Sequence, residues 1–261
     1  MTGFGGRDAR AITAVLPFLK LAMKGYFRSD VRDMDRVPDG GVLMVSNHSG
    51  GLTPMDVPIL AVALAEEFGA DRPLYCLAHD ILFTGINGPI MKKFGFVPAT
   101  REAAHEILTS GALTIVFPGG DFDSFRPSSK ANVIDFNGRV GYVRTAIRAK
   151  VPIVPVVSIG GQETQFHLTR GETLGAKSPL GKFIRSPYLP ITIGFPFGIT
   201  PVFPPNIPLP SKIVTQVLEP IDIEKEFGTD PDLTVVDAEI RARMQVALDE
   251  LAKQRRFPVI G

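Results

Sequence analysis

This sequence is poor in cysteine and has almost no excess of charge of either sign. The single cysteine, Cys76, cannot form an internal disulfide, and its apolar neighbours predict a small buried side chain. Lys and Arg total 28 against 27 Asp and Glu, which disfavours a generally basic protein that binds nucleic acid. Hydrophobic residues make up 44% and charged residues 21%, which excludes a disordered tail. We therefore expect a folded, cytosolic-facing protein with no nucleic-acid partner.

The sequence also lacks the long apolar runs of membrane-spanning and secreted chains. No stretch reaches about 18 apolar residues without a charge, so no spanning helix is expected. Residues 1–9 carry Arg7 and Asp8 and do not form the short basic region followed by an apolar run that a secretory signal needs. The prediction is a chain without a signal peptide.

The N-terminal residues 1–36 are predicted to form an amphipathic helical segment. Leu16, Leu19 and Met23 share one helical face, and the segment holds seven Arg or Lys against four Asp, a net charge of +3. Such a segment is typical of peripheral or monotopic binding to anionic headgroups at the cytoplasmic face of a membrane. It is also typical of an ordinary helix that packs on the domain with its charges solvated, and both alternatives stay open.

Residues 183–210 are rich in Phe, Ile, Leu and Pro and poor in charge, which is unusual for a soluble surface. One interpretation is that this stretch walls an acyl groove or contacts lipid. The other is an irregular connection of strands and loops that covers the core, because proline-broken apolar sequence is also typical of buried extended chain.

The rest of the chain alternates between strand and helix patterns. The predicted strands are 42–46, 74–78, 113–117, 153–158 and 213–218, with a short extended piece at 94–99. The predicted helices are 54–67, 101–110, 141–149 and 235–255. This alternation predicts an α/β fold with a mostly parallel mixed sheet flanked by helices. At 261 residues the chain can bury one large core, so we expect residues 37–261 to form a single domain.

Polar and glycine-rich residues follow two of these predicted strands directly. Asn47-His48-Ser49-Gly50-Gly51 follows strand 42–46, and Pro118-Gly119-Gly120-Asp121 follows strand 113–117. Ligand crevices of parallel sheets lie outside the carboxyl ends of the strands. We therefore expect the two strand ends to converge on one site.

His48 is the candidate catalytic base of this site. Histidine has an unperturbed pKa of about 6.5, so an imidazole bound to a carboxylate accepts a proton from an alcohol at neutral pH without a metal. Asp56, at the start of the next helix, is the predicted carboxylate that folds back across the Gly50-Gly51 loop, with Thr53 as a weaker substitute. The simpler alternative is that His48 caps a turn and Asp56 caps a helix. No pair of histidines has zinc-ligand spacing, so no metal is predicted.

Two arginines are candidate anion ligands. Arg101 begins a predicted helix, where backbone N–H groups and a guanidinium together bind an anion such as a phosphate. Arg126 follows the glycine pair at 119 and 120 and is a second candidate of the same kind. A solvated arginine in a first helical turn is the alternative for Arg101.

Four sequence blocks follow one another between residues 42 and 160. They are Asn47-His48-Ser49-Gly50-Gly51 with a downstream Asp, Gly95-Phe96-Val97-Pro98-Ala99-Thr100-Arg101-Glu102, Val116-Phe117-Pro118-Gly119-Gly120 and Val151-Pro152-Ile153-Val154-Pro155-Val156. In this order the blocks resemble the phospholipid/glycerol acyltransferases related to bacterial 1-acylglycerol-3-phosphate acyltransferase. One block would be a weak signal, whereas four in order are fairly specific. Residues 209–212, followed by a strand, are also similar to the tail of that family.

The resemblance implies a glycerolipid acyltransferase-like fold and acyl transfer from a thioester, usually acyl-CoA, to a hydroxyl of a glycerolipid. On the matching positions His48 is the base and an Asp orients it, while Arg101 and the Gly119-Gly120 loop bind the acceptor. No bound cofactor or metal is implied, because acyl-CoA is a co-substrate. The residues predicted to bind substrate are Asn47, Ser49, Gly50, Gly51, Arg101, Pro118, Gly119, Gly120 and Arg126.

Two departures from the family pattern bear on the reaction. The Asp usually comes five positions after the His, but that position is Thr53 here, and Asp56 lies three residues later. Either a longer loop still brings Asp56 to His48, or the dyad is altered. The third block carries Gly119 where the family usually has Glu, which resembles the branch that acylates mono- or diacylglycerol. Arg101 keeps a lysophospholipid acceptor open.

The leading prediction is therefore an acyl-CoA-dependent O-acyltransferase that works at a membrane surface through a ternary complex. A serine esterase or lipase-like hydrolase is one alternative, because residues 156–160 half-match a nucleophile elbow around Ser158. Residues 48–51 also faintly resemble an oxyanion loop. In such a hydrolase, however, the catalytic histidine follows the nucleophile, and His167 lies only nine residues after Ser158. A non-catalytic acyl-lipid-binding protein is the other alternative, if the shifted Asp means that catalysis is lost.

Overall fold

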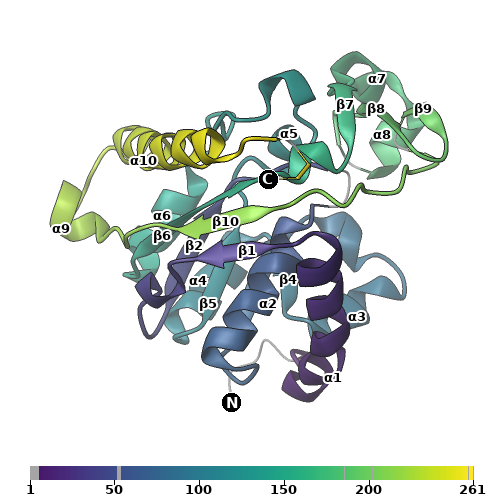
Figure 1. Cartoon of the computed structure of the whole chain (residues 1–261). Helices are drawn as coiled ribbons and strands as arrows, with labels where there is room; N and C mark the ends of the chain where they lie inside the picture. Colours follow the sequence, from purple (N-terminus) through teal and green to yellow (C-terminus); the bar gives the residue numbers. More distant parts are fainter. Residues whose placement is uncertain (1–5, 52–53, 185, 202, 258, 261) are drawn as a thin grey trace.

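A computed structural model of the chain describes residues 6–51, 54–184, 186–201, 203–257 and 259–260. They form a seven-stranded sheet with helices on both faces and a separate three-stranded sheet (Figure 1). In the view of Figure 1 the long helix α10 lies above the large sheet, and α1 and α2 lie below it.

The large sheet has the strand order β1-β10-β6-β2-β5-β3-β4, so β2 lies at its centre. Neighbouring strands are parallel except β10 and β6, which are antiparallel. This confirms the predicted mostly parallel mixed sheet. In spatial order the strands are β1 (Asp30–Arg32), β10 (Val214–Val217), β6 (Ile153–Ile159), β2 (Val42–Ser46), β5 (Leu113–Val116), β3 (Leu74–Ala78) and β4 (Phe96–Pro98).

Both faces of the large sheet are covered, which explains why its central strands are continuous apolar runs. Successive side chains of a strand point to opposite faces. Val42 and Met44 accordingly pack toward α2 (Asp56–Phe68), while Leu43 and Val45 belong to the core beneath α6 (Gly141–Ala149) and α10 (Leu233–Gln254). Helix α4 (Arg101–Thr109) lies beside α6. These layers place the ends of β2 and β5 between two groups of helices.

The N-terminal segment is part of this fold. Helix α1 (Ala9–Lys20) continues into the π-helical turn η1 (Leu21–Tyr26), and its inner residues Leu16 and Leu19 pack against the buried Ile59 and Val62 of α2. Strand β1 pairs with β10, so residues on both sides of the predicted boundary at residue 36 belong to the same sheet. Within the described parts of the chain, no helix combines the length and the apolar character needed to span a bilayer.

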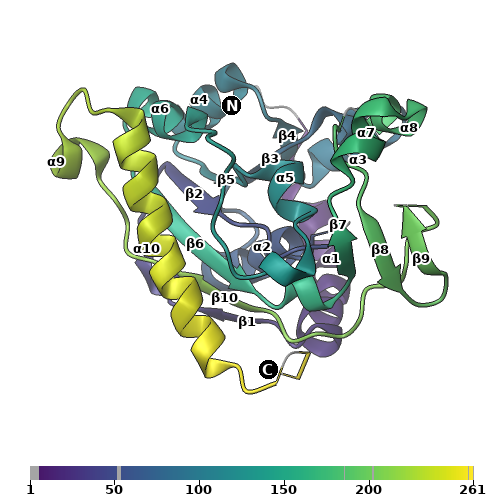
Figure 2. The same cartoon turned by 90° about the horizontal axis from the view of Figure 1, so that it is seen from above.

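The three-stranded sheet was not predicted. It consists of β7 (Phe166–Thr169), β8 (Ile191–Gly194) and β9 (Gly198–Pro201), all antiparallel in the order β7-β8-β9. It lies next to α5, as Figure 2 shows from above. The remaining elements are η2 (Met34–Arg36), η3 (Asp80–Phe83), α3 (Asn87–Lys93), α5 (Gly120–Ser124), η4 (Ser128–Lys130), η5 (Gly161–Glu163), α7 (Glu172–Lys177), α8 (Pro179–Ile184) and α9 (Ile223–Phe227).

Candidate active site

The residues that follow β2 and β5 meet at the carboxyl edge of the large sheet. The imidazole of His48 stacks on the ring of Phe117, with 4.0 Å between ring centroids and 2° between ring planes. The backbone N–H of His48 donates a hydrogen bond to Asp123, which lies in α5. The predicted convergence of the two strand ends is confirmed.

His48 is held by Asp56 despite the longer spacing between them. His48 Nδ1 lies 3.3 Å from Asp56 Oδ2, and the same oxygen accepts the Ser49 N–H at 2.9 Å. The other oxygen, Oδ1, accepts the Ser49 hydroxyl at 2.5 Å. Asp56 is buried and is the first residue of α2, where the helix dipole favours an anion. Thr53, the predicted weaker substitute, lies outside the described residues.

The turn between His48 and Asp56 requires a glycine at position 50. Gly50 has a φ of +115°, a conformation that side chains other than glycine rarely adopt. A Cβ atom there would also lie 2.5 Å from the side-chain Cδ of the buried Gln162. Gly51 has a φ of +102° as well. The glycine pair lets the chain reverse, so that the start of α2 reaches the ring of His48.

Asn47 and Ser49 both have partners within the protein. The side-chain amide of Asn47 donates to the Ser158 carbonyl and accepts the Ser158 N–H, each at 2.9 Å. These bonds continue the pairing of β2 with β6 one residue beyond the end of β2. Since Ser49 is bonded to Asp56, both residues shape the loop around His48, and their predicted contact with substrate stays a prediction.

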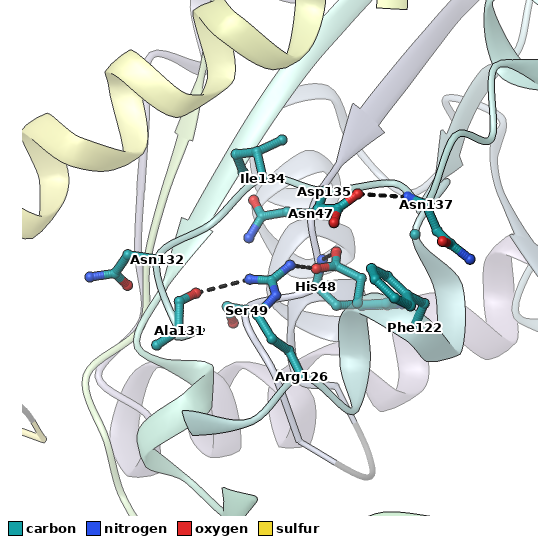
Figure 3. Close-up of polar contacts among 12 residues, drawn as sticks. Asn47, His48, Ser49, Phe122, Arg126, Ala131, Asn132, Ile134, Asp135 and Asn137 are labelled. Carbon is teal, nitrogen blue, oxygen red and sulfur yellow. Dashed lines mark hydrogen bonds and ion pairs between the residues drawn. The ribbon is translucent and has the colours of Figure 1, made fainter. Parts of the chain in front are cut away.

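Asp123 and Arg126 form a buried ion pair behind His48. Asp123 Oδ2 accepts the His48 N–H at 2.6 Å, and Asp123 Oδ1 pairs with the Arg126 guanidinium. Figure 3 shows this guanidinium between Asp123 and the loop that carries Ala131, whose carbonyl accepts a hydrogen bond from it at 2.9 Å. Burial, followed by the charge of Arg170, lowers the pKa of Arg126 to about 10, so it remains charged at neutral pH.

The burial of Arg126 changes how its predicted role is understood. The side chain is 1% exposed and faces Asp123, whereas an anion ligand for a substrate would face the crevice. An incoming anion would have to replace Asp123. Arg126 therefore supports the carboxylate that binds the His48 backbone, and anion binding by Arg126 stays a prediction that this placement does not favour.

The glycine at position 119 leaves room for Asp123. A Cβ atom on Gly119 would lie 2.4 Å from the Asp123 Cβ, closer than two carbon atoms can approach. The carbonyls of Pro118 and Gly119 accept hydrogen bonds from Arg139 at 3.2 and 2.9 Å. Gly120 begins α5. The loop predicted to bind the acceptor thus has its carbonyls directed at Arg139, and any contact with substrate would use other atoms of the loop.

Arg101 lies on the same edge of the sheet but away from His48. It is the exposed first residue of α4, whose N-cap Thr100 accepts the Ala103 N–H at 3.2 Å. Within the described parts of the chain, Arg101 makes no hydrogen bond or ion pair. Because neighbouring strands lie about 4.8 Å apart, the three strand steps from β2 to β4 correspond to about 14 Å. Arg101 is therefore exposed and distant from His48, and its contact with an anion of the substrate stays a prediction.

The prediction of a nucleophile elbow at Ser158 is wrong. Ser158 lies inside β6, which pairs on both sides, and its buried hydroxyl is 3.1 Å from the Thr215 hydroxyl. His167, the histidine that follows Ser158 in the sequence, is a buried residue of β7. Burial lowers the pKa of His167 to about 4. The hydrolase alternative therefore lacks an exposed nucleophile.

Sequence reasoning assigned no role to Asp123, Phe117 or Arg139, although all three contact the site loops. Asp123 and Arg126 are three positions apart, a spacing at which opposite charges pair on one helical turn. That spacing is the one local signal for the ion pair. Among the residues that the structure describes, no group of three or more His, Cys, Asp or Glu side chains is placed to bind a metal ion.

A largely apolar cavity of about 410 Å³ lies along α2. It runs along α2 from Val57 and Pro58, which follow Asp56 directly, to Phe68 in the last turn. The inner face of α1 and the first residues of β3, β4 and β5 form its other walls. The 13 residues of α2 span about 20 Å. The size is typical of a pocket for a small apolar ligand.

A family model described as acyltransferase matches residues 28–159. This chain belongs to the acyltransferase family. All four sequence blocks, His48, Asp56 and the Asp123–Arg126 pair lie within the match. The predicted resemblance to phospholipid/glycerol acyltransferases is confirmed.

Relatives of this acyltransferase occur in bacteria and in animals. The chain is 36% identical to the uncharacterized protein Rv0502 of Mycobacterium tuberculosis over 253 residues, which cover 95% of this chain and 68% of that protein. It is 28% identical to the DGAT1/2-independent enzyme synthesizing storage lipids of Mus musculus over 200 residues, which cover 72% of this chain and 55% of that enzyme.

The fold of this acyltransferase is similar to that of a solved structure. The 1-acyl-sn-glycerophosphate (LPA) acyltransferase PlsC of Thermotoga maritima matches with a TM-score of 0.56 and 21% identity, over 95% of this chain and 85% of the other. This likeness confirms the predicted acyltransferase-like α/β fold.

Proposed function

We propose that this acyltransferase moves a fatty acyl group from acyl-CoA to a hydroxyl of a glycerolipid, with His48 as the general base. The observation that carries this proposal is the contact of His48 Nδ1 with the buried Asp56 at the carboxyl edge of β2. The other ring nitrogen, Nε2, makes no hydrogen bond with the described residues. It is therefore available to accept a proton from a substrate.

The reaction needs one proton transfer to His48 and one from it. Nε2 takes the proton of the acceptor hydroxyl while the oxygen attacks the thioester carbonyl. Backbone N–H groups stabilise the oxyanion of the tetrahedral intermediate. When the carbon–sulfur bond breaks, the imidazolium returns its proton to the departing thiolate, which leaves as free CoA. No acyl-enzyme forms.

Asp56 and Phe117 prepare His48 for this role. An Nδ1–H that donates to Asp56 fixes the tautomer in which Nε2 is unprotonated, and the carboxylate stabilises the imidazolium that forms. The stacked ring of Phe117 restricts rotation of the imidazole and excludes water from one of its faces. Asp123 fixes the main chain of the same residue.

We further propose that the cavity along α2 takes the acyl chain of the donor. Its walls are almost entirely apolar, and its near end at Val57 is adjacent to Asp56. A thioester carbonyl beside His48 would direct the alkyl chain toward this end of the cavity. Burial of the chain there would stabilise the bound donor by about 0.8 kcal/mol for each methylene group.

The acceptor is either a neutral glycerolipid or a lysophospholipid. Gly119 in place of Glu, together with the similarity to an enzyme named for storage-lipid synthesis, favours mono- or diacylglycerol. The exposed Arg101, with no ion-pair partner among the described residues, favours a phosphate on the acceptor. The two classes are separate arms of the test below.

The site is proposed to work peripherally at the cytoplasmic face of a membrane. Phe18 of α1 and Leu21, the first residue of η1, are 76% and 73% exposed. Lys20 and Lys24 pair with Glu66 at 2.6 and 2.7 Å, so these two cations also serve the fold. The apolar side chains therefore contribute most of the proposed contact of α1 with lipid.

The experiment that tests the function measures release of free CoA from a long-chain acyl-CoA. The acceptors are lysophosphatidate, other lysophospholipids, monoacylglycerol and diacylglycerol, and each lipid product is identified by mass. We expect one acceptor class to raise the rate, and His48→Ala to lower it by about 10²–10⁴-fold. His105→Ala, on the partly exposed α4, is the matched control and should keep the parent rate. The function is wrong if no acceptor raises CoA release above background.

A further inference from the structure

The three-stranded sheet carries an apolar surface that the proposed reaction does not use. We call β8, β9 and residues 203–207 the apolar hairpin. Phe195, Ile199 and Phe203 are 69%, 67% and 57% exposed, and Phe197 and Ile207 are more than half exposed. Figure 2 shows β8 and β9 projecting away from the large sheet. A contiguous apolar surface of this kind marks an interaction site.

The sequence of the apolar hairpin and its surroundings carries few charges. No charged residue occurs between Arg185 and Lys212, and no Asp or Glu occurs between Glu172 and Glu219. Lys177 and Lys182, on α7 and α8, are exposed. Glu172, at the start of α7, is exposed as well. An uncharged apolar projection with cations nearby is complementary to a lipid surface with anionic headgroups.

The polar backbone groups at the tip of the hairpin are bonded within the protein. The buried Asn206 accepts the Phe197 N–H at 3.0 Å and donates to the Gly198 carbonyl at 2.9 Å. The Ile207 N–H donates to the Phe195 carbonyl at 2.8 Å. Pro196 within the tip has no N–H to satisfy. A segment that enters a hydrocarbon environment needs this internal bonding, because lipid offers no hydrogen-bond partners.

The apolar hairpin adjoins the exposed side of the N-terminal helix. The Tyr26 hydroxyl of η1 donates to the Pro208 carbonyl at 2.7 Å, next to the exposed Ile207. This bond places the end of η1 beside the hairpin.

The hairpin is also tied to the candidate active site through the elements beside it. Arg170, which follows β7, donates to the Phe122 carbonyl at 2.9 Å and lies over the Phe122 ring at 3.7 Å. The Ser186 hydroxyl, before β8, donates to Asp121 Oδ2 at 2.7 Å. Phe122 and Asp121 belong to α5, which also carries Asp123. A hairpin seated in a bilayer would therefore hold the crevice at the membrane surface.

We propose that the apolar hairpin is a wedge that inserts into the boundary between headgroups and acyl chains of an anionic bilayer. The inference rests on the proposed function only in one respect, namely that a glycerolipid acceptor resides in a membrane. Lipid insertion itself requires no catalysis.

The absence of tryptophan from the sequence allows a direct test. Phe197→Trp introduces a single indole at the tip, and Val246→Trp introduces one at a residue of α10 that is 65% exposed. Both full-length variants are mixed with phosphatidylcholine vesicles that contain phosphatidylglycerol and brominated acyl chains. We expect a blue shift and quenching of the indole at position 197, and neither effect at position 246.

A second measurement compares binding of serine variants to the same vesicles without bromine. Phe195→Ser, Phe197→Ser and Phe203→Ser should each lower the partition coefficient about tenfold, because each removes an exposed ring from the lipid contact. Val246→Ser should leave it unchanged. Since all four side chains are exposed, the variants should unfold at the temperature of the parent.

Three results would overturn the wedge. The first is binding to vesicles with no quenching at position 197, and the second is no binding at all. The third is a parent that self-associates without lipid while the serine variants stay monomeric, because the surface would then be a protein interface. Quenching at position 197 without any acyl transfer would leave the wedge and remove the proposed function. Acyl transfer without quenching would support the proposed function and overturn the wedge.

Discussion

The segments that follow β2 and β5 each supply a buried carboxylate to His48, but the two carboxylates bind different parts of that residue. Asp56 lies 3.3 Å from the ring nitrogen, whereas Asp123 accepts the backbone N–H at 2.6 Å. Asp56 has two neutral hydrogen-bond donors from Ser49, and Asp123 has the charged Arg126. One carboxylate is part of the chemistry of the ring, and the other is part of the framework that fixes where the ring lies.

Two histidines near these segments have different surroundings. His48 is partly exposed and has a carboxylate partner, while His167 packs in the interior against Phe125 of the second segment. The comparison shows that a carboxylate and access to the crevice, rather than the residue type, distinguish the candidate base.

Removing the charge of Asp56 should have the largest effect on activity. In Asp56→Asn the amide no longer stabilises an imidazolium and favours the wrong tautomer, so we expect kcat to fall by about 10²-fold or more. Steady-state kinetics with the best acceptor measure this change. Asp39→Asn, at an exposed aspartate, is the control. A kcat close to that of the parent would show that Asp56 only shapes the loop.

Removing the charge of Asp123 should act chiefly on stability. Asp123→Ala leaves the Arg126 guanidinium buried without its partner, so we expect the free energy of unfolding to fall by about 3–5 kcal/mol. Urea unfolding measures the loss. The double variant with Arg126→Met should recover much of it, because no unpaired charge then remains. Equal losses in the single and double variants would argue against the ion pair.

His167 should make stability depend on pH. Its pKa is lowered to about 4 in the folded protein from 6.5 for the free side chain, so between these values the unfolded chain binds a proton that the folded protein does not. The free energy of unfolding should therefore fall as the pH drops from about 6.5 to about 4, by about 3 kcal/mol in total from this residue. His167→Gln should show a shallower decrease in chemical unfolding across this range. An identical pH dependence in both proteins would contradict the assignment.

Arg101 should have the smallest effect, and only with one acceptor class. If it binds a phosphate, Arg101→Ala should raise KM for a lysophospholipid about tenfold with little change in kcat, because the contact is remote from the reacting atom. KM for monoacylglycerol should not change. Lys150→Ala, at the exposed lysine that follows α6, controls for a general loss of positive charge. Equal changes with both acceptors would exclude phosphate recognition by Arg101.

Much of the large sheet could be predicted because its information is local. The apolar runs gave the bounds of β2 and β3 correctly, and the helical pattern gave those of α6. The His48–Asp56 contact was accessible for the same reason, since both residues flank one short glycine turn. The alternation of strands and helices then indicated which strand ends share an edge.

The features that the sequence left open depend on contacts between distant residues. The bond from the His48 backbone to Asp123 joins segments 75 positions apart and exists only because β2 and β5 are neighbours. The three-stranded sheet was hidden because its strands are only four residues long, prolines lie between β8 and β9 and at the end of β9, and several of its apolar residues face outward. The burial of Arg126 and Ser158 likewise follows from packing that no local pattern reports.

The contact between Gly119 and Asp123 has a consequence for how this sequence can vary. Because a Cβ at position 119 would lie 2.4 Å from the Asp123 Cβ, the two positions compete for one volume. In a homologous chain with Glu at the first position, either the second position is glycine or the backbone of the loop is displaced, because every other residue has a Cβ. Positions 119 and 123 should therefore vary together among homologous chains. A substitution at one position alone would disturb the contact of Asp123 with the His48 backbone.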